Sequence, residues 1–137
     1  MLEAIRPELV EMSFREYLMA DEMTMSYNAK WGGTIPFPRE EWEDWYDAWI
    51  RKSDNKRYYR YLKNEADEFV GEIAYHYDRR RDIYICDVII LAKFRNRGYG
   101  TIISAYQHLA ETILAVFAMG MAYADQCMQY VANGFIG

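Results

Sequence analysis

The sequence has no long apolar run and few cysteines, and both absences exclude classes of protein. No stretch approaches the roughly 20 apolar residues that a membrane-spanning helix needs, so we expect no membrane partner. The two cysteines, Cys86 and Cys127, lie in apolar surroundings without metal-ligand spacing. We therefore expect buried free thiols rather than a disulfide or a reactive thiol.

Positive charge is also scarce. The formal net charge is -5, and because contact with nucleic-acid phosphates needs a basic face, we expect no nucleic-acid partner. The first residues carry acids where a secretory signal would be basic, which predicts a cytoplasmic location. His76 and His108 lie far apart without a neighbouring ligand pattern, so no metal site is predicted.

Hydrophobic residues, at 52%, and aromatic residues, at 17%, are abundant instead. This composition argues against disorder. A length of 137 residues allows one domain with a core but is too short for two ordinary ones. We expect a single domain, 1–137, with a helical segment at 1–52 and a core containing a sheet at 57–137.

Two regions near the amino terminus have helical spacing. Residues 8–30 mix apolar and acidic side chains with this period, and Ser13 is a candidate N-cap. A second helix is expected to start near Pro38 and to place tryptophans on one face of the segment 42–49.

Strand patterns follow, and then a further helix. Residues rich in tyrosine, valine and isoleucine predict strands at 57–62, 69–77 and 83–91. Polar turns separate them, which predicts an antiparallel meander of three strands. From Tyr99 to Phe117 apolar residues recur at helical spacing, so we expect a helix packed on the sheet.

The most informative stretch is Arg95-Asn96-Arg97-Gly98-Tyr99-Gly100, between the apolar run 88–91 and this last helix. Two glycines two positions apart let the backbone turn sharply and approach a ligand closely. Free amides at the start of a helix attract anions. The stretch predicts a pyrophosphate-binding loop and a phosphorylated cofactor; the alternative is a helix cap that binds nothing.

Arg95-x-x-Gly98-x-Gly100 after a meander, followed by Tyr130-x-x-x-Gly134-Phe135, resembles the GCN5-related N-acetyltransferase (GNAT) family from about residue 69 to residue 135. The stretches 27–28, 31–33 and 42–46 also resemble bacterial acetyltransferases whose substrates are often unassigned. The resemblance implies an α/β (α+β) fold, a mostly antiparallel mixed sheet flanked by helices. It also implies transfer of an acetyl group from acetyl-CoA to a primary amine of a small molecule or protein, by direct attack in a ternary complex.

Carried onto this sequence, the resemblance implies how acetyl-CoA is held. The strand before the loop splays from its neighbour and offers backbone groups to the pantetheine arm. The loop offers amides and arginine charges to the pyrophosphate. The implied cofactor-binding residues are Ile89, Ile90, Leu91, Arg95, Asn96, Arg97, Gly98, Tyr99, Gly100 and Thr101.

Acetyl transfer to an amine also needs a route for the ammonium proton, and two carboxylates on predicted strands are candidate bases. Glu72 leads, because alternation places it on one strand face with Val70, Ala74 and His76, and partial burial would raise its pKa. Asp87 lies on the third strand, where several members of the family carry a catalytic carboxylate. A chain of water molecules without a single base is the third possibility.

Tyr130 occupies the position of a tyrosine that, in the family, often protonates the departing thiolate; the alternative is a core aromatic with a hydrogen-bonded hydroxyl. The family builds its acceptor pocket near the acidic, tryptophan-rich segment 40–49, although we favour ordinary amphipathic packing for that segment.

Family members continue past the Gly-Phe pair into another strand, whereas this sequence ends at Gly137. We expect a truncated chain, a strand supplied by a second subunit, or a carboxyl end refolded as helix. The second explanation predicts a homodimer. The missing strand also supports a rival function, a noncatalytic acyl-CoA-binding or protein-interaction module with a degenerate acetyltransferase fold.

Overall fold

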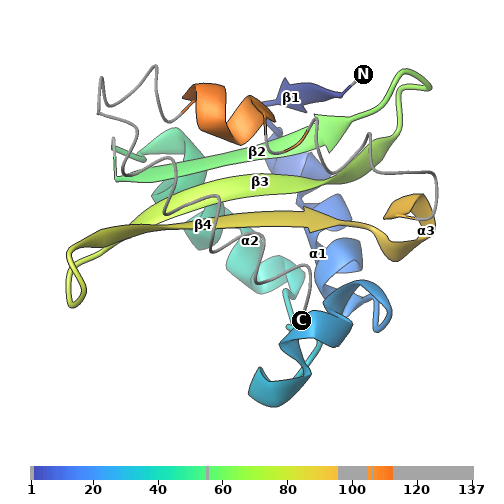
Figure 1. Ribbon diagram of the computed structural model, residues 1–137, viewed down its shortest axis with the longest axis horizontal. Helices are drawn as coiled ribbons and strands as arrows, with labels where there is room; N and C mark the ends of the chain where they lie inside the picture. The colour runs from blue at the N-terminus through green and yellow to red at the C-terminus, as the bar shows by residue number, and fades with distance from the viewer. Residues whose placement is uncertain (1, 55, 96–104, 106, 113–137) are drawn as a thin grey trace.

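The computed structural model describes residues 2–54, 56–95, 105 and 107–112. Within them, four strands form one antiparallel sheet in the order β1-β2-β3-β4 (Figure 1). The strands are β1 (Glu3–Ile5), β2 (Arg57–Lys63), β3 (Phe69–Asp78) and β4 (Ile83–Ile90). The predicted meander is confirmed. The sequence does not predict β1, because three residues are too few to show an alternating pattern.

Side chains with local hydrogen bonds build both turns of the meander. Asn64 Oδ1 accepts the backbone N–H groups of Ala66 and Glu68, each at 3.0 Å, between β2 and β3. Between β3 and β4, Asp78 Oδ1 accepts the N–H of Arg80 at 2.9 Å. Such bonds favour turns over continued strand.

The helices before the sheet are short. The helical segments are η1 (Leu9–Glu11), α1 (Met12–Ala20), η2 (Thr24–Trp31), η3 (Arg39–Glu41), α2 (Trp42–Tyr46), η4 (Asp47–Arg51) and α3 (Ala92–Arg95). Both predicted amino-terminal helices are confirmed, and the second starts after Pro38 as expected. Ser13 is not a cap, because the helical backbone already starts at η1, where Glu8 N–H donates to Glu11 Oε2 at 2.8 Å.

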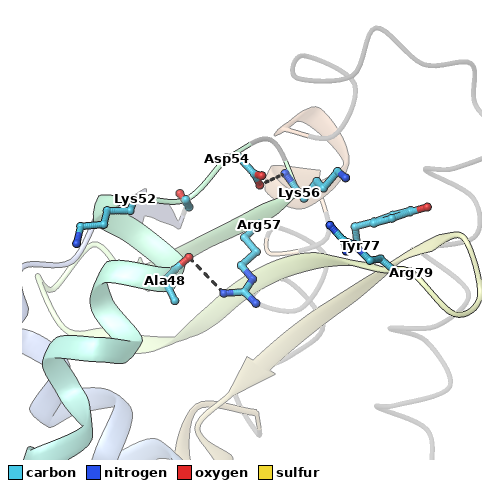
Figure 2. A pocket seen from close by; sticks show the side chains of 8 residues that line it. Ala48, Lys52, Asp54, Lys56, Arg57, Tyr77 and Arg79 are labelled. Atoms are coloured by element: carbon cyan, nitrogen blue, oxygen red, sulfur yellow. Dashed lines mark hydrogen bonds between the residues drawn. The ribbon is translucent and has the colours of Figure 1, made fainter.

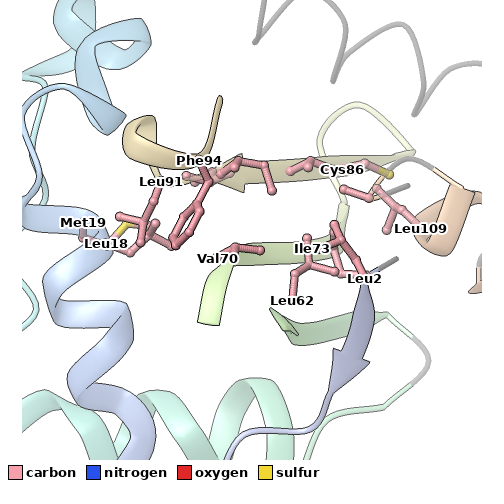
Figure 3. Close-up of a cluster of buried hydrophobic side chains, with 14 of the residues drawn as sticks. Leu2, Leu18, Met19, Leu62, Val70, Ile73, Cys86, Leu91, Phe94 and Leu109 are labelled. Atoms are coloured by element: carbon pink, nitrogen blue, oxygen red, sulfur yellow. The ribbon is translucent and has the colours of Figure 1, made fainter. Parts of the chain in front are cut away.

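Each face of the sheet carries its own core. We call the first the aliphatic cluster; Figure 3 shows part of it. In this cluster, residues of the sheet pack against Ala105 and Leu109, which belong to the helical residues 105 and 107–112. The predicted packing of the helix after the glycine loop on the sheet is therefore confirmed for its described residues. The other face, which we call the aromatic face, lies under α1 and α2. Its buried residues are Met12, Phe37, Trp42, Tyr46, Ile50, Tyr59, Tyr61 and Ala74.

A bulge next to the β2–β3 turn changes one predicted orientation. Leu62 pairs with Gly71 but Lys63 pairs with Phe69, so Val70 has no partner in β2. Val70 consequently packs in the aliphatic cluster beside Ile73 (Figure 3). The prediction that it shares a face with Glu72 is wrong, because one extra residue inverts the alternation on one side of the bulge.

Cys86 also differs from expectation. It is buried in the aliphatic cluster, but its sulfur is disulfide-bonded, so the prediction of a free thiol there is wrong. The tertiary fold decides which sulfurs meet, and two cysteines distant in sequence carry no sign of it. Disulfides are rare in a reducing cytosol. The cytoplasmic location stays a prediction.

The described part of the chain contains no helix that is both long enough and apolar enough to pass through a membrane.

Gly71 on β3 has no room for a side chain beside β4. A Cβ atom added there would lie 2.1 Å from the backbone oxygen of Ile89, and a backbone atom cannot move aside as a side chain does. We predict that Gly71→Ala lowers the free energy of unfolding by about 3 kcal/mol. Urea denaturation measures this change; a loss below about 1 kcal/mol would contradict the close approach.

Candidate functional site

Glu72 is a charged residue in the middle of the sheet. On β3 it lies between its partners Tyr61 on β2 and Ile89 on β4, and only 4% of its surface is exposed. The hydroxyl of Tyr59 donates a hydrogen bond to Glu72 Oε2. Carboxylates are seldom buried without such partners, so this position requires a specific environment.

Burial raises the pKa of Glu72, and two neighbours oppose the rise. The positive charge of Arg15 is the larger opposing influence, and the hydrogen bond from Tyr59 is the smaller one. Desolvation penalises the charged carboxylate, whereas a nearby cation and a donor favour it. Glu72 therefore binds its proton more tightly than an exposed glutamate.

Arg15 lies on α1, and its guanidinium is surrounded by aromatic rings. Its guanidinium carbon lies 4.3 Å from the centre of the Trp45 ring, 4.7 Å from that of Phe37 and 6.0 Å from that of Tyr59. These distances are within the range of cation–π attraction. Arg15 Nε is buried and has no hydrogen-bond partner within the described residues.

Tyr61 fixes α1 above the aromatic face. Its hydroxyl oxygen accepts the backbone N–H of Arg15 at 3.2 Å, and the hydroxyl donates to the backbone oxygen of Glu11 at 2.7 Å. A single side chain of β2 therefore holds the backbone at the start of α1. As a result, the position of the Arg15 guanidinium relative to the sheet is set by the fold.

Asp87, the other candidate base, lies on the same face as Glu72. It pairs with Ala74, which is two residues from Glu72 and two from His76. Diagonal neighbours of this kind are about 7–8 Å apart in an antiparallel sheet. Burial raises the pKa of Asp87, and the charges of His76 and Arg15 lower it. Asp87 is only partly buried, so of the two carboxylates it is the more accessible.

His76 and Tyr27 are two further polar residues near these carboxylates. The His76 ring meets Trp49 edge to face at 5.7 Å, and its Nδ1 atom is buried without a partner in the described residues. The pKa of Tyr27, on η2, is raised by burial and then by the charges of Asp87 and Glu72. Tyr27 therefore brings a neutral hydroxyl towards both carboxylates.

The cofactor side of the site is described as far as Arg95. In the described sheet β4 is an edge strand, so its outer side is paired with no described strand. Leu91 N–H donates to Val70 O at 2.9 Å, so it faces β3 rather than this edge. Arg95 Nε donates to Ile90 O at 2.9 Å, and its Nη2 to Thr24 O at 3.0 Å.

Most of the predicted loop lies outside the described residues. Of the implied cofactor residues, the structure places Ile89, Ile90 and Leu91, all buried, and Arg95. The sequence does not predict that Arg95 donates to two backbone oxygens. The residues Asn96, Arg97, Gly98, Tyr99, Gly100 and Thr101, and the candidate acid Tyr130, lie outside the described residues.

Sequence reasoning missed two residues that determine the setting of Glu72. Tyr59 could have been found, because the predicted hairpin places it beside the glutamate on a neighbouring strand. Arg15 could not, since a single arginine in an amphipathic helix is normally a solvated residue. Its role depends on the aromatic rings of another segment, whose proximity the sequence does not indicate.

Comparison with known families decides the assignment. Residues 14–116 match the model of the family described as "Acetyltransferase (GNAT) family". The chain belongs to the GNAT acetyltransferase family. The matched region contains most of α1, the meander and the described part of the helix that follows it. The recognition and the fold class expected from the sequence are therefore confirmed.

Two solved structures resemble this GNAT chain. One is glucosamine-6-phosphate N-acetyltransferase from Arabidopsis thaliana, with a TM-score of 0.46, 12% identity, and coverage of 82% of this chain and 76% of that chain. The other is the YycN protein from Bacillus subtilis, a proposed acetyltransferase, with a TM-score of 0.46, 18% identity, and coverage of 88% and 76%. No curated protein matches this sequence.

The raised pKa of Glu72 predicts a pH-dependent stability. A carboxyl whose pKa rises on folding stabilises the protein fully below its ordinary pKa of 4.5, and this contribution is lost as pH rises through the folded-state pKa. Glu72→Gln removes the titration. We predict that the unfolding free energy of Glu72→Gln, relative to wild type, increases from about pH 4 to about pH 8.

Denaturant titrations across this pH range measure the difference. The attraction of Arg15 is already part of this pH dependence, because its charge favours the ionised carboxylate and holds the folded-state pKa below the level that burial alone would give. A difference that is constant or falls with pH would contradict the raised pKa.

Proposed function

We propose that the protein is an N-acetyltransferase that transfers an acetyl group from acetyl-CoA to a primary amine of a small molecule or protein. Membership of the GNAT family supports acetyl transfer in general. The observation that carries the proposal is the pair of carboxylates, Glu72 and Asp87, held with raised pKa values on one face of the sheet. A general base for the ammonium proton needs such a pKa.

The two acids differ in exposure, and the proposal gives them different roles for that reason. A base must reach the proton that it removes, and Asp87 is partly exposed where Glu72 is almost fully covered. We assign Asp87 as the base, although Glu72 leads on the sequence alone. Glu72 then acts as a positioning residue, because its charge sets the protonation of the groups around it.

The edge of β4 fits the acetyl donor. Its outer side is unpaired in the described sheet, and extended ligands with amide groups bind such edges through main-chain hydrogen bonds. In the proposal, the backbone of residues 89–91 holds the pantetheine arm, and residues 95–101 hold the pyrophosphate. Leu91 N–H is already bonded to Val70, and the carbonyl of Ile90 already accepts Arg95 Nε, so a contact of the arm with Ile90 O would be shared with Arg95.

The remaining parts of the mechanism stay proposals. Direct attack by the amine in a ternary complex needs only one base and one acid, and Tyr130 is the proposed acid. The homodimer and the cytoplasmic location are further predictions without a test in the structure.

Release of free thiol from acetyl-CoA, measured with a panel of primary amines, tests the proposed activity. We predict that Asp87→Asn lowers kcat by a factor of about 10² to 10⁴, because the ammonium proton loses its acceptor. Glu72→Gln should lower kcat by less than Asp87→Asn and shift the pH profile. Glu16→Gln, an exposed acid on α1, is the matched control and should leave kcat unchanged.

Two outcomes would contradict the proposal. No thiol release with any amine, from a protein that binds acetyl-CoA, would favour the noncatalytic acyl-CoA-binding module. Full activity of Asp87→Asn would exclude Asp87 as the base and return the role to Glu72 or to bound water.

A further inference from the structure

A second polar region lies at the opposite end of the sheet from Arg95. A cavity of about 470 Å³ opens where β2 begins and β3 ends, and Figure 2 shows the side chains that line it. Four of its lining residues are basic and one is acidic: Lys52, Lys56, Arg57, Arg79 and Asp54. This concentration of positive charge contrasts with a net charge of -5 for the whole chain.

Three of these cations have no carboxylate partner in the part of the chain that the structure describes. Lys52 Nζ is bound to Asp47 at 3.1 Å, but Lys56, Arg57 and Arg79 form no ion pair within the described residues. Asp54 Oδ1 accepts the backbone N–H of Lys56 at 2.8 Å, and its charge offsets one of the four positive charges of the lining. Like charges gathered without counter-charges repel one another, and a bound anion would relieve this repulsion.

Aromatic rings help to place two of the cations. The Arg57 guanidinium lies 5.2 Å from the centre of the Trp49 ring, and Lys56 Nζ lies 5.1 Å from that of Tyr77. Contact with a ring face restricts the side chain while leaving N–H donors available. The cavity therefore presents charges that are partly positioned before any ligand arrives.

We infer that this cavity binds a small molecule through a phosphate group. A phosphate ester carries about -1.5 to -2 charges and three acceptor oxygens. It therefore matches three cations that form no ion pair among the described residues better than a single carboxylate does, although one Arg57 N–H already donates to Ala48 O at 3.5 Å. Arginine and lysine both bind phosphate well. A volume of 470 Å³ exceeds that of a phosphate alone and is in the usual range for small-molecule sites, so the rest of the ligand fits as well.

Calorimetric titration of inorganic phosphate into the full chain tests this site. Saturating CoA is present, so that phosphate cannot bind at the proposed cofactor loop. We predict saturable binding with a Kd of about 1 mM or tighter at low salt, weakened as ionic strength is raised. The combined variant Lys56→Gln, Arg57→Gln, Arg79→Gln should bind at least about tenfold more weakly, because three charge-assisted contacts are lost.

Arg80→Gln is the matched control, since Arg80 is an exposed arginine in the same turn but does not line the cavity. It should keep the wild-type affinity within about twofold. If the combined variant fails to fold, Arg79→Gln alone, at an exposed position, should still weaken binding about threefold.

The proposal is overturned if wild type shows no saturable binding up to about 20 mM phosphate, or if the variants that lose lining cations bind as tightly as Arg80→Gln. A protein that gives no heat with CoA but still binds phosphate in its absence would contradict the proposed acetyltransferase function and leave this site intact.

Discussion

The burial of the Glu72 carboxylate is the constraint on which the aromatic face depends. A carboxylate in the middle of a sheet needs a donor and a positive charge, which here come from Tyr59 on β2 and Arg15 on α1. The Arg15 guanidinium in turn lies among the rings of Phe37 and Trp45. One acid thus links the sheet to both of the helical regions that precede it.

The same arrangement gives two carboxylates different properties on one surface. Glu72 is enclosed, whereas Asp87, diagonal to it on β4, keeps some access to solvent and has His76 and Tyr27 as neighbours. The charge of Asp87 raises the pKa of Glu72, whereas the charge of Arg15 lowers the pKa of both acids. Burial makes both acids bind a proton more tightly than exposed carboxyls do, which suits the proposed proton transfer from an amine.

The three strands of the meander could be predicted, because residues 57–62, 69–77 and 83–91 each show a strand-like pattern over the usual length of one strand. β1 could not, because three residues carry no period, and it is defined by pairing with β2. Both candidate bases were found as acids within strands, but the bulge at Val70 and the role of Arg15 depend on register and on contacts between distant segments. The glycine loop was predicted from its motif alone; residues 96–101 lie outside the described residues, so it stays a prediction.

The central claim is that this chain binds acetyl-CoA, and its melting temperature with acetyl-CoA, CoA and ATP tests that claim most directly. Ligand at about 100 times its Kd stabilises a protein by roughly 2.7 kcal/mol, which raises the midpoint by several degrees. We predict this shift with acetyl-CoA and CoA, none with ATP, and none for Gly98→Asp, whose carboxylate would repel the pyrophosphate. An equal shift with all three ligands, or no shift with any, would contradict the account.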